Sequence, residues 1–570
     1  MDVVVQCLHA AGVRHIFGVP GGPLTAFYEA LAARGTIRHV LARHEQGAAF
    51  MANGYARVGR TLGVCCATSG PGATNAFTGI AASMVDSVPV LLITAQVATR
   101  AFGRGVAQDG SPLGIDVVQA YKQATKFSAM LAHAERAQDL AERAIRIALS
   151  GRHGPVHLSF PADVARQPAT YVARHGSNVL PHAAGVDPDG VAAIVATLRA
   201  ARRPCILAGA GVSRAAASAL FEFATREGIP VATTPKAKGA FPENHVLSLG
   251  VLGLAGHTLA EAWFNAPEQD VVLVVGSSLG ETVTYGWDPL RKAGGALLQI
   301  DIDPCELGKN YPVTIGLPAD AERALREMAL VVERSPRLSS RGTEPLVNDL
   351  RALFPGVHAI EAYDAEAIPI KPQRVIRELQ LALPPDALLF VDIGNCMLWA
   401  GNLFEARAPG TYFINLGFGS MGHSVAAAIG GQLAAPGQRV VVLTGDAAFA
   451  MNGMEVHTAV EQAAPVTWVV MNNAGHAMVR QGEVVLRDTP VSDASFTTPI
   501  DICRLGEALG AAGLTVDSPE HLRSALRVAL TSNRPHVLDV RIDCNEVPPA
   551  LGQRATALRK AFANTKLPGF

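Results

Sequence analysis

Residues 440–449 read VVVLTGDAAF, and residues 466–473 read VTWVVMNN. Each stretch begins with an apolar, Val-rich run that is typical of a buried strand. A helical pattern from about Gly453 to Gln462 lies between them, so the segment predicts a β-α-β unit. Such units cross over in a right-handed sense, so both strands are parallel and end at one edge of the sheet. The segment therefore places this chain among the α/β proteins.

Two oxygen-bearing side chains directly follow these strands. Asp446 comes after the first strand and Asn473 after the second, about 27 residues later. We expect them side by side above a helix N-terminus, where N–H groups favour an anion. Carboxylate and amide oxygens are hard ligands that suit Mg²⁺, which leaves positions for phosphate oxygens. Either dipeptide alone is an ordinary turn or strand end, but the pair at this spacing predicts a magnesium and phosphate site.

The same alternation of strand-like and helical patterns runs along all 570 residues, which predicts parallel sheets with crossover helices. It falls into three blocks, residues 1–166, 191–334 and 373–547, which we interpret as three doubly wound α/β domains with parallel sheets. Two stretches with little periodicity, Gln167–Gly190 and Ser335–Pro372, are expected to connect them.

The strongest strand predictions come from continuous apolar runs. They are Leu62–Ala67, Val90–Thr94, Val156–Ser159, Pro204–Ala208, Val271–Val275, Leu297–Ile302, Leu388–Val391, Val440–Leu443, Val466–Met471 and His536–Val540. The last residues, Pro548–Phe570, are expected to form a basic, weakly patterned tail.

The composition excludes several classes of protein. The chain is 49% hydrophobic and 17% charged with a formal net charge of −1, so it offers no field for nucleic acid or an anionic membrane. No apolar run reaches the roughly 18 residues that span a bilayer, and residues 1–6 lack the features of a signal peptide. The eight cysteines are scattered without a C-x-x-C pair, which is typical of free thiols in a reducing compartment. We therefore expect a cytoplasmic enzyme with no nucleic-acid or membrane partner.

The motif Gly-Asp-Ala followed by Asn-Asn resembles the cofactor motif of thiamin-diphosphate (ThDP) dependent enzymes, and nearly the whole chain is similar to the large catalytic subunit of acetolactate synthase. The resemblance implies a pyrimidine-binding first domain, a central nucleotide-fold-like domain and a third domain that binds diphosphate and Mg²⁺. The matching segments are Phe17–Gly22, Arg43–Ala49, Gly54–Arg57, Thr68–Asn75, Ile300–Pro304, Asp392–Gly394, Gly419–Gly422, Gly445–Ala447 and Asn472–Asn473.

The resemblance implies catalytic roles for three residues. Glu45 matches the family's catalytic glutamate, which hydrogen-bonds the pyrimidine ring and so promotes loss of a proton from the reactive carbon of the cofactor. Taken alone, Glu45 would only open a helix over Gln46–Arg57, where acidic residues are favoured. Gln108 matches a residue beside the reacting substrate. His476 is either a general acid–base or a loop histidine that contributes only its backbone.

The resemblance also implies the cofactor contacts. The metal ligands are Asp446, Asn473 and the backbone carbonyl of Gly475, and Met421 holds the cofactor in a bent shape. Asn395 and Cys396 match two positions in a loop that contacts the diphosphate, but the family often has Gln and His there. The other implied contacts are Gly21, Pro71, Asn75, Gly394, Gly419, Gly445, Ala447, Ala448, His476, Ala477 and Met478. In this family, two subunits share each cofactor, so we expect a homodimer or homotetramer.

Two departures from the family affect ligand choice. The Arg-Phe-Asp-Asp-Arg segment beside FAD in acetolactate synthases is replaced by Ser278–Thr282, so we expect FAD to be absent or weakly held. Ala107 replaces a Phe and Gly482 replaces a Trp, and each change removes on the order of 150–250 Å² of aromatic surface. A pocket short of two aromatics predicts a substrate larger than pyruvate or of different polarity, unless other side chains fill the space.

The predicted reaction is decarboxylation of a pyruvate-like 2-oxo acid, followed by addition of the remaining unit to a second carbonyl. A simple decarboxylase or a lyase of 2-hydroxy-ketones remains as the alternative, because these differ only in pocket geometry. A non-catalytic binding partner is disfavoured because Glu45, Asp446 and Asn473 are all present. A nicotinamide dehydrogenase is disfavoured because Gly209–Arg214 lacks the last glycine of G-x-G-x-x-G.

Overall fold

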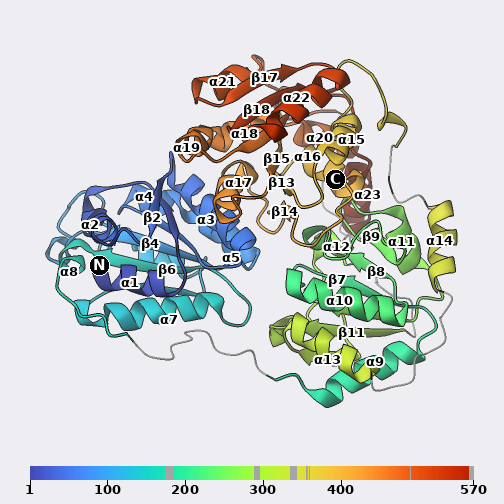
Figure 1. Ribbon diagram of the computed structural model, residues 1–570, viewed down its shortest axis with the longest axis horizontal. Coiled ribbons are helices and arrows are strands. Elements are labelled where there is room, and N and C mark those ends of the chain that lie inside the picture. Colours follow the sequence, from blue (N-terminus) through green and yellow to red (C-terminus); the bar gives the residue numbers. More distant parts are fainter. Residues whose placement is uncertain are drawn as a thin grey trace.

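The computed structural model describes residues 1–173, 185–284, 286–287, 295–333, 343–354, 357, 360–487 and 489–563. It contains three lobes, each built on a six-stranded sheet with helices on its faces (Figure 1). Every ladder between the described strands is parallel. The predicted fold class, three doubly wound parallel-sheet domains, is therefore confirmed.

The first lobe has the strand order β2-β1-β3-β4-β6-β5. Its strands are β1 (His15–Gly18), β2 (Arg38–Leu41), β3 (Gly63–Ala67), β4 (Val90–Gln96), β5 (Phe127–Met130) and β6 (Val156–Pro161). Its helices are α1 (Asp2–Ala10), α2 (Thr25–Arg34), α3 (Glu45–Gly59), α4 (Pro71–Asn75), α5 (Phe77–Val85), α6 (Val117–Tyr121), α7 (Ala137–Leu149) and α8 (Ala162–Ala165).

The central lobe has the order β12-β11-β10-β7-β8-β9, which is that of dinucleotide-binding folds. Its strands are β7 (Pro204–Ala208), β8 (Val231–Thr233), β9 (Ser248–Val251), β10 (Val271–Val275), β11 (Ala296–Asp301) and β12 (Ile315–Pro318). Its helices are α9 (Pro188–Ala200), α10 (Arg214–Glu227), α11 (Thr258–Asn265), α12 (Glu281–Thr284), α13 (Ala321–Glu333) and α14 (Thr343–Leu353).

The third lobe has the order β14-β13-β15-β16-β18-β17. Its strands are β13 (Leu388–Val391), β14 (Tyr412–Ile414), β15 (Val440–Gly445), β16 (Val466–Asn472), β17 (Ala512–Val516) and β18 (His536–Arg541). Its helices are α15 (Pro372–Ala382), α16 (Asn395–Leu403), α17 (His423–Ala434), α18 (Asp446–Asn452), α19 (Val456–Glu461), α20 (Ala477–Arg487), α21 (Ile502–Ala508), α22 (Pro519–Thr531) and α23 (Pro549–Ala563).

The ten predicted strands all form, and their ends lie within two residues of the prediction. The strands that the sequence did not reveal are short ones such as β8 and β14, whose few residues carry too weak a pattern. The predicted connection at Ser335–Pro372 was wrong in part, because residues 343–353 form α14. The predicted tail was also wrong in part, because α23 runs through Ala563. Residues 174–184 of the other predicted connection lie outside the described part of the chain.

The first and third lobes pack through α3 and α17 (Figure 1). Two glycines allow the helix backbones to touch. A Cβ on Gly54 would lie 1.9 Å from the carbonyl oxygen of Ala427, and one on Gly430 would lie 1.9 Å from that of Met51. Any larger residue would force the helices apart. This contact joins the cores of the two lobes into one hydrophobic cluster.

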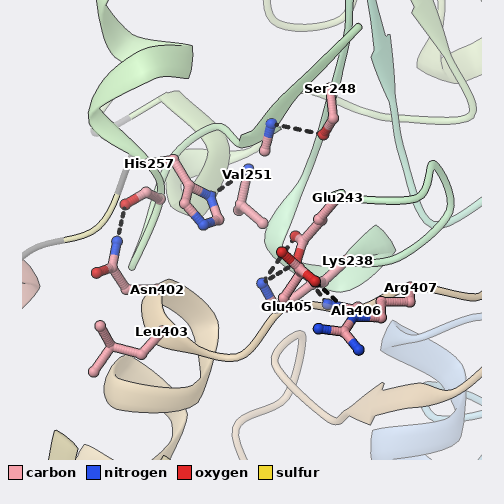
Figure 2. A network of polar contacts seen from close by, with 12 residues as sticks. Lys238, Glu243, Ser248, Val251, His257, Asn402, Leu403, Glu405, Ala406 and Arg407 are labelled. Atoms are coloured by element: carbon pink, nitrogen blue, oxygen red, sulfur yellow. Dashed lines mark hydrogen bonds and ion pairs between the residues drawn. The ribbon is translucent and has the colours of Figure 1, made fainter. Parts of the chain in front are cut away.

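The central and third lobes are joined by a buried polar network (Figure 2). The ammonium group of Lys238 donates to both carboxylate oxygens of Glu243 at 2.8 Å, and Glu243 also accepts from the backbone N–H of Ala406 at 2.8 Å. The side chain of Asn402, near the end of α16, donates to the carbonyl oxygen of Gly256 at 2.7 Å. Burial lowers the pKa of Lys238, and the contact with Glu243 opposes that shift. The network fixes one end of α16 against the central lobe.

Candidate active site

The carboxyl edge of the third sheet contains a topological switch point between β13 and β15. From β13 the chain places β14 on one side and β15 on the other. In open parallel sheets, ligands bind in the crevice outside the strand ends at such a point. The loop that begins at Asp392 and the end of β15 at Thr444 and Gly445 flank this crevice, so the predicted diphosphate residues lie where the topology favours a ligand.

Asp446 is the first residue of α18 and is 1% exposed. The predicted helical stretch from about Gly453 to Gln462 forms as a short 3-10 helix at Gly453–Glu455 followed by α19, whereas α18, directly after β15, was missed. One carboxylate oxygen of Asp446 accepts from the backbone N–H of Gly475 at 2.9 Å. Burial raises the pKa of Asp446, and backbone N–H groups oppose that shift.

Three oxygen-bearing groups converge beside Asp446. The terminal amide group of Asn473 has an atom 3.0 Å from the carbonyl oxygen of Gly475 and 3.3 Å from Asp446 Oδ1. With its nitrogen at that position, Asn473 donates to both oxygens. With its oxygen there, an amide, a carboxylate and a main-chain carbonyl face one another. Three acceptors in this arrangement need a cation between them, and hard oxygen donors suit Mg²⁺.

Gly475 is held in place by the chain opposite it. Its φ angle is +149°, and a Cβ would lie 2.4 Å from the carbonyl oxygen of Ala494. Only glycine fits both conditions without strain. Among the described residues, no group of three or more His, Cys, Asp or Glu side chains is arranged to hold a metal ion. The oxygen set at Asp446 has a single carboxylate, so it depends on an amide and on the backbone position that Gly475 permits.

The loop after β13 leads into α16, with Gly394 at φ +145°. Asn395 donates to Gln481 Oε1 at 2.7 Å, while the Gln481 side chain donates to the carbonyl oxygens of Cys544 and Glu546, both at 3.0 Å. The two carbonyls fix the Gln481 amide, which in turn fixes the Asn395 amide. Cys396 is buried and donates to the carbonyl oxygen of Asp392 at 3.2 Å. Burial raises the pKa of its thiol.

The remaining predicted contacts of the third lobe surround the same edge. Gly419 has a φ angle of +73°, and the half-buried Met421 follows it just before α17. Ala447 and Ala448 are buried in the first turn of α18. Ala477 is buried at the start of α20, and Met478 packs partly against the core. Gly445 ends β15 and is the N-cap residue of α18.

His476 lies just before α20 and is half-buried. Its backbone N–H donates to the carbonyl oxygen of Ala494 at 2.7 Å, and its own carbonyl accepts from Val479 at 3.0 Å. The imidazole ring contacts Phe496 edge-on, with 5.9 Å between the ring centres. The backbone of His476 is therefore structural, whereas its ring nitrogens have no hydrogen-bond partner among the described residues.

The first lobe places the predicted pyrimidine contacts around the start of α3. Glu45 is buried, and its carboxylate accepts from the side chain of Asn75 at 3.0 Å. A Cβ on Gly72 would lie 3.2 Å from Glu45 Oε1, so the carboxyl group lies against α4. Pro71 begins α4. The loop after β1 closes on the loop after β3, because a Cβ on Gly21 would lie 2.3 Å from the hydroxyl oxygen of Thr68.

Gln108 belongs to an exposed loop and has a φ angle of +64°. Its side-chain carbonyl accepts from the hydroxyl of Ser69 at 3.3 Å, which links this loop to the Gly-rich turn before α4. Asp109 shapes the loop by accepting from the backbone N–H groups of Gly103 at 2.8 Å and Ser111 at 2.9 Å. Ala107 is exposed beside Gln108.

The two groups of predicted residues are not joined by a polar contact within one chain. No hydrogen bond or ion pair in the described residues joins Glu45 or Asn75 to Asp446, Asn473 or Gly475. Figure 1 shows α4 in the left-hand lobe and α16, α18 and α20 in the third lobe.

Glu455 is a residue whose place near Glu45 the sequence did not reveal. It is 1% exposed and follows α18. Its carboxylate accepts from the backbone N–H groups of Arg43 at 3.1 Å and His44 at 3.0 Å, across 412 and 411 residues of chain. It thereby fixes the residues just before Glu45. Gln481 was also missed, and Asp392 was noted only as part of a matching segment without a role, because the sequence around a buried polar residue does not reveal its distant contacts.

A cavity of about 520 Å³ lies where the three lobes meet, beside the strand ends of β7 and β10. Its described lining carries five carboxylates, namely Asp86, Glu281, Asp301, Glu306 and Asp320. The two described Lys and Arg residues of the lining are already paired: Lys236 with Asp86 at 3.2 Å, and Arg152 with Glu306 at 2.9 Å. Burial raises the pKa of Asp301. This part of the lining is acidic and offers little to a pyrophosphate.

Three family models match this chain. They are the N-terminal binding domain, the central domain and the C-terminal binding domain of thiamine pyrophosphate enzymes, at residues 1–116, 191–328 and 392–540. Thiamine pyrophosphate is the same compound as ThDP. Together with relatives that align over nearly the whole chain, the matches show that this chain belongs to the thiamine pyrophosphate enzymes.

Within that family, the chain is similar to large subunits of acetolactate synthase. It is 33% identical over 561 residues to a probable acetolactate synthase large subunit of Methanocaldococcus jannaschii, covering 96% of this chain and 92% of the relative. It is 31% identical over 558 residues to the isozyme 1 large subunit of Escherichia coli, covering 96% and 95%. The resemblance inferred from the motifs is therefore confirmed. In the described part of the chain, no helix is both long and apolar enough to cross a membrane.

Proposed function

We propose that this protein is a ThDP- and Mg²⁺-dependent carboligase, which decarboxylates a pyruvate-like 2-oxo acid and joins the remaining unit to a second carbonyl compound. The observation that carries this proposal is the convergence of Asp446, Asn473 and the Gly475 carbonyl at the switch point of the third sheet. These oxygens suit Mg²⁺, and the helix N-termini of α18 and α20 beside them suit a diphosphate.

In this proposal, the third domain (residues 373–547) anchors the cofactor and the first domain (residues 1–166) activates it, with residues 191–334 as the central domain. Bound ThDP would supply a carbon nucleophile and hold the electron pair that remains when carbon dioxide leaves. The buried carboxyl of Glu45 would exchange a proton with the pyrimidine ring, oriented by the amide of Asn75. Gln108, beside the Gly-rich turn, would contact the substrate.

We propose further that the donor or acceptor is larger than in acetolactate synthesis. A Cβ on Gly482 would meet only Leu551 Cδ1, at 3.9 Å. The space next to Gly482 therefore admits a larger group, although Leu551 from α23 covers one side of it. Ala107 is exposed, so no side chain of its own chain replaces the aromatic ring that the family carries there.

A lyase or simple decarboxylase of the same family is the second candidate. Its support is the exposure of the loop around Gln108, which leaves access for water. Incubating the full-length protein with ThDP, Mg²⁺ and a panel of 2-oxo acids, with and without an added aldehyde, tests both. A coupled 2-hydroxy-ketone supports the carboligase. Carbon dioxide release without coupled product supports the decarboxylase, and cleavage of 2-hydroxy-ketones supports the lyase. A protein that binds no ThDP in the presence of Mg²⁺ contradicts all three.

We also propose a homodimer or homotetramer in which each site takes Glu45 from one subunit and Asp446 from its neighbour. The absence of a hydrogen bond or ion pair between the two half-sites, among the described residues of one chain, supports this arrangement. Refolding an equal mixture of Glu45→Ala and Asp446→Ala subunits tests it. Half of the dimers would be hybrids with one intact site of two, so about a quarter of wild-type activity should return. A site built within one chain would return none.

We propose that FAD is absent or weakly held. The acidic lining of the described part of the central cavity and the prior pairing of Lys236 and Arg152 support this. Stoichiometric flavin absorbance in the purified protein would contradict the FAD proposal.

The eight cysteines are all free and five are buried, which supports a reducing compartment.

A further inference from the structure

Asp392 follows β13 and is 1% exposed, yet it has no role in the reaction described above. Its Oδ1 accepts from the backbone N–H groups of Ile393 at 2.8 Å and Gly422 at 3.1 Å. Its Oδ2 accepts from the hydroxyl of Thr444 at 3.2 Å. Burial raises the pKa of Asp392 to about 7, and these donors oppose the shift. Its buried oxygens are therefore satisfied by neutral groups.

The three donors belong to three different segments around the candidate site, namely two loops and the end of β15. Ile393 precedes Gly394 in the loop between β13 and α16. Gly422 follows Met421 and caps α17, and Thr444 precedes Gly445 and Asp446. Because β13 and β15 flank the switch point, the bond from Thr444 to Asp392 spans the crevice in which a ligand is expected.

We propose that Asp392 is a positioning residue that holds these three segments in one fixed arrangement around the diphosphate and magnesium site. An aspartate suits this role because each carboxylate oxygen accepts from more than one direction on a short side chain. The inference rests on the proposed function, since the ligand that the segments surround is the diphosphate of ThDP.

The loop that carries Met421 is also fixed from its other side. Gly422 has a φ angle of +77°, and a Cβ there would lie 2.7 Å from Asn452 Nδ2 and 3.0 Å from the carbonyl oxygen of Ala448. The loop therefore lies between α18 and the carboxylate of Asp392. Loss of that carboxylate would free the loop on one side while α18 still blocks the other, so we expect a changed loop position rather than an unfolded lobe.

A purely structural role is the competing explanation, and Glu378 provides a matched control for it. Glu378 is a buried carboxylate in α15 of the same lobe, 2% exposed, and it pairs with Arg374 at 2.9 Å and Arg523 at 3.1 Å. It touches none of these three segments. Glu378→Ala should lower stability, because it removes one of the two carboxylates that pair with the buried Arg374, but it should leave ThDP binding unchanged.

The experiment measures the dissociation constant of ThDP at saturating Mg²⁺, by calorimetry on the full-length protein, for wild type, Asp392→Ala, Asp392→Asn and Glu378→Ala. Urea unfolding without cofactor is measured alongside. We expect Asp392→Ala to weaken binding by about 10–100-fold, the range seen when groups that orient ligands are lost. Asp392→Asn should stay within about threefold, because its amide oxygen still accepts from Ile393 and Gly422, and the Thr444 hydroxyl can rotate to accept from its NH₂.

Unchanged ThDP affinity in Asp392→Ala would overturn the inference, as would equal weakening in Asp392→Ala and Glu378→Ala. Weakening in Asp392→Asn as large as in Asp392→Ala would also overturn it, because the charge rather than the hydrogen-bond geometry would then matter. If Asp392→Ala does not fold, Thr444→Val decides, with weaker ThDP binding expected and unchanged binding overturning the inference. A wild-type protein that binds no ThDP contradicts the proposed function, which this test separates from a failure of the Asp392 proposal alone.

Discussion

The first and third lobes have the same strand order but different chemistry at their edges. In each, the first strand lies between the second and the third, and the last two strands follow the fourth in the same sequence. The helices that pack the lobes together, α3 and α17, follow the second strand of each sheet, so they occupy equivalent places. The topology alone thus provides two similar crevices, and the side chains at the strand ends decide what each one does.

The difference lies in how the loops at the two switch points are spaced. In the first lobe, the loops after β1 and β3 touch, with Gly21 against Thr68. In the third lobe, the loop after β13 is linked to the end of β15 through the carboxylate of Asp392 and the hydroxyl of Thr444. The third lobe also carries the oxygen set around Asp446, whereas the first lobe carries one carboxyl, Glu45, with a neutral amide partner. The third lobe is suited to anchor a ligand and the first to exchange protons with it.

The largest effect that tests this division is expected at Glu45. Glu45→Gln keeps the shape of the side chain but cannot exchange a proton, so turnover should fall by about 10²–10⁴-fold, the usual contribution of such a group. ThDP affinity should change little, because the anchoring groups lie in the other lobe. Carbon dioxide release at saturating cofactor and ThDP calorimetry measure the two quantities. Glu29→Gln on the exposed face of α2 is the control, and near-wild-type turnover of Glu45→Gln would refute the division.

The next largest effect is expected on the Mg²⁺ requirement for ThDP binding, which tests the oxygen set around Asp446. Asp446→Asn removes the only carboxylate of the oxygen set, so the Mg²⁺ concentration needed for half-maximal ThDP binding should rise on the order of 100-fold. Titration of Mg²⁺ at fixed ThDP measures it. Asp501→Asn is the control, since Asp501 caps α21 through the N–H of Arg504 at 3.0 Å and pairs with the Arg504 side chain at 3.3 Å. An unaltered Mg²⁺ requirement in Asp446→Asn would place the metal elsewhere.

A smaller effect is expected on substrate choice. Each of the two lobes lacks one aromatic side chain that the family carries, at Ala107 in the first lobe and at Gly482 in the third. Gly482→Trp should shift the ratio of kcat/KM between a larger and a smaller 2-oxo acid by about 10–100-fold toward the smaller one, because a filled cavity rejects extra methylenes. Gly437→Trp, at an exposed turn with open space around it, is the control. An unchanged ratio in Gly482→Trp would mean that this space does not contact substrate.

The smallest expected effect is on the pH dependence of stability. Two buried groups contribute to it with opposite sign: His157 in the first lobe and Asp392 in the third. His157 in β6 bonds to the hydroxyls of Thr94 at 2.8 Å and Ser128 at 2.9 Å, and burial lowers its pKa from 6.5 to about 3. Between those pH values the unfolded chain binds a proton that the native state excludes. Stability should therefore fall as pH decreases from 6.5 toward 3, by up to about 1.4 kcal/mol per pH unit from this group.

Urea unfolding at several pH values below 6.5 measures this slope, and His157→Gln should make it shallower than in wild type. An identical pH slope in wild type and His157→Gln would show that His157 takes up a proton in the folded protein.

The contribution of Asp392 to the pH dependence of stability has the opposite sign. Its pKa of about 7 lies above the unfolded value of 3.8, so the native carboxyl group keeps its proton to higher pH. Stability from this group therefore falls as pH rises between those values.

Much of the fold was readable from local pattern. The long strands β4, β10 and β16 are continuous apolar runs, and such runs specify a strand buried on both faces wherever they occur. The short strands and α23 were missed, because three or four residues, or a mixed helix, gain most of their stability from packing rather than from their own sequence.

The sequence by itself determined the sheet class, the family, and which acid and amide follow the strands β15 and β16. Strand runs and motif spacing are local properties, so the order of residues is sufficient to read them. Only the tertiary structure decided that the backbone N–H of Gly475 meets Asp446, that Glu455 fixes the residues before Glu45, and that Asp392 joins two loops to the end of β15. Those contacts join segments that are distant in the chain, and packing of the whole molecule, rather than any local preference, brings such segments together.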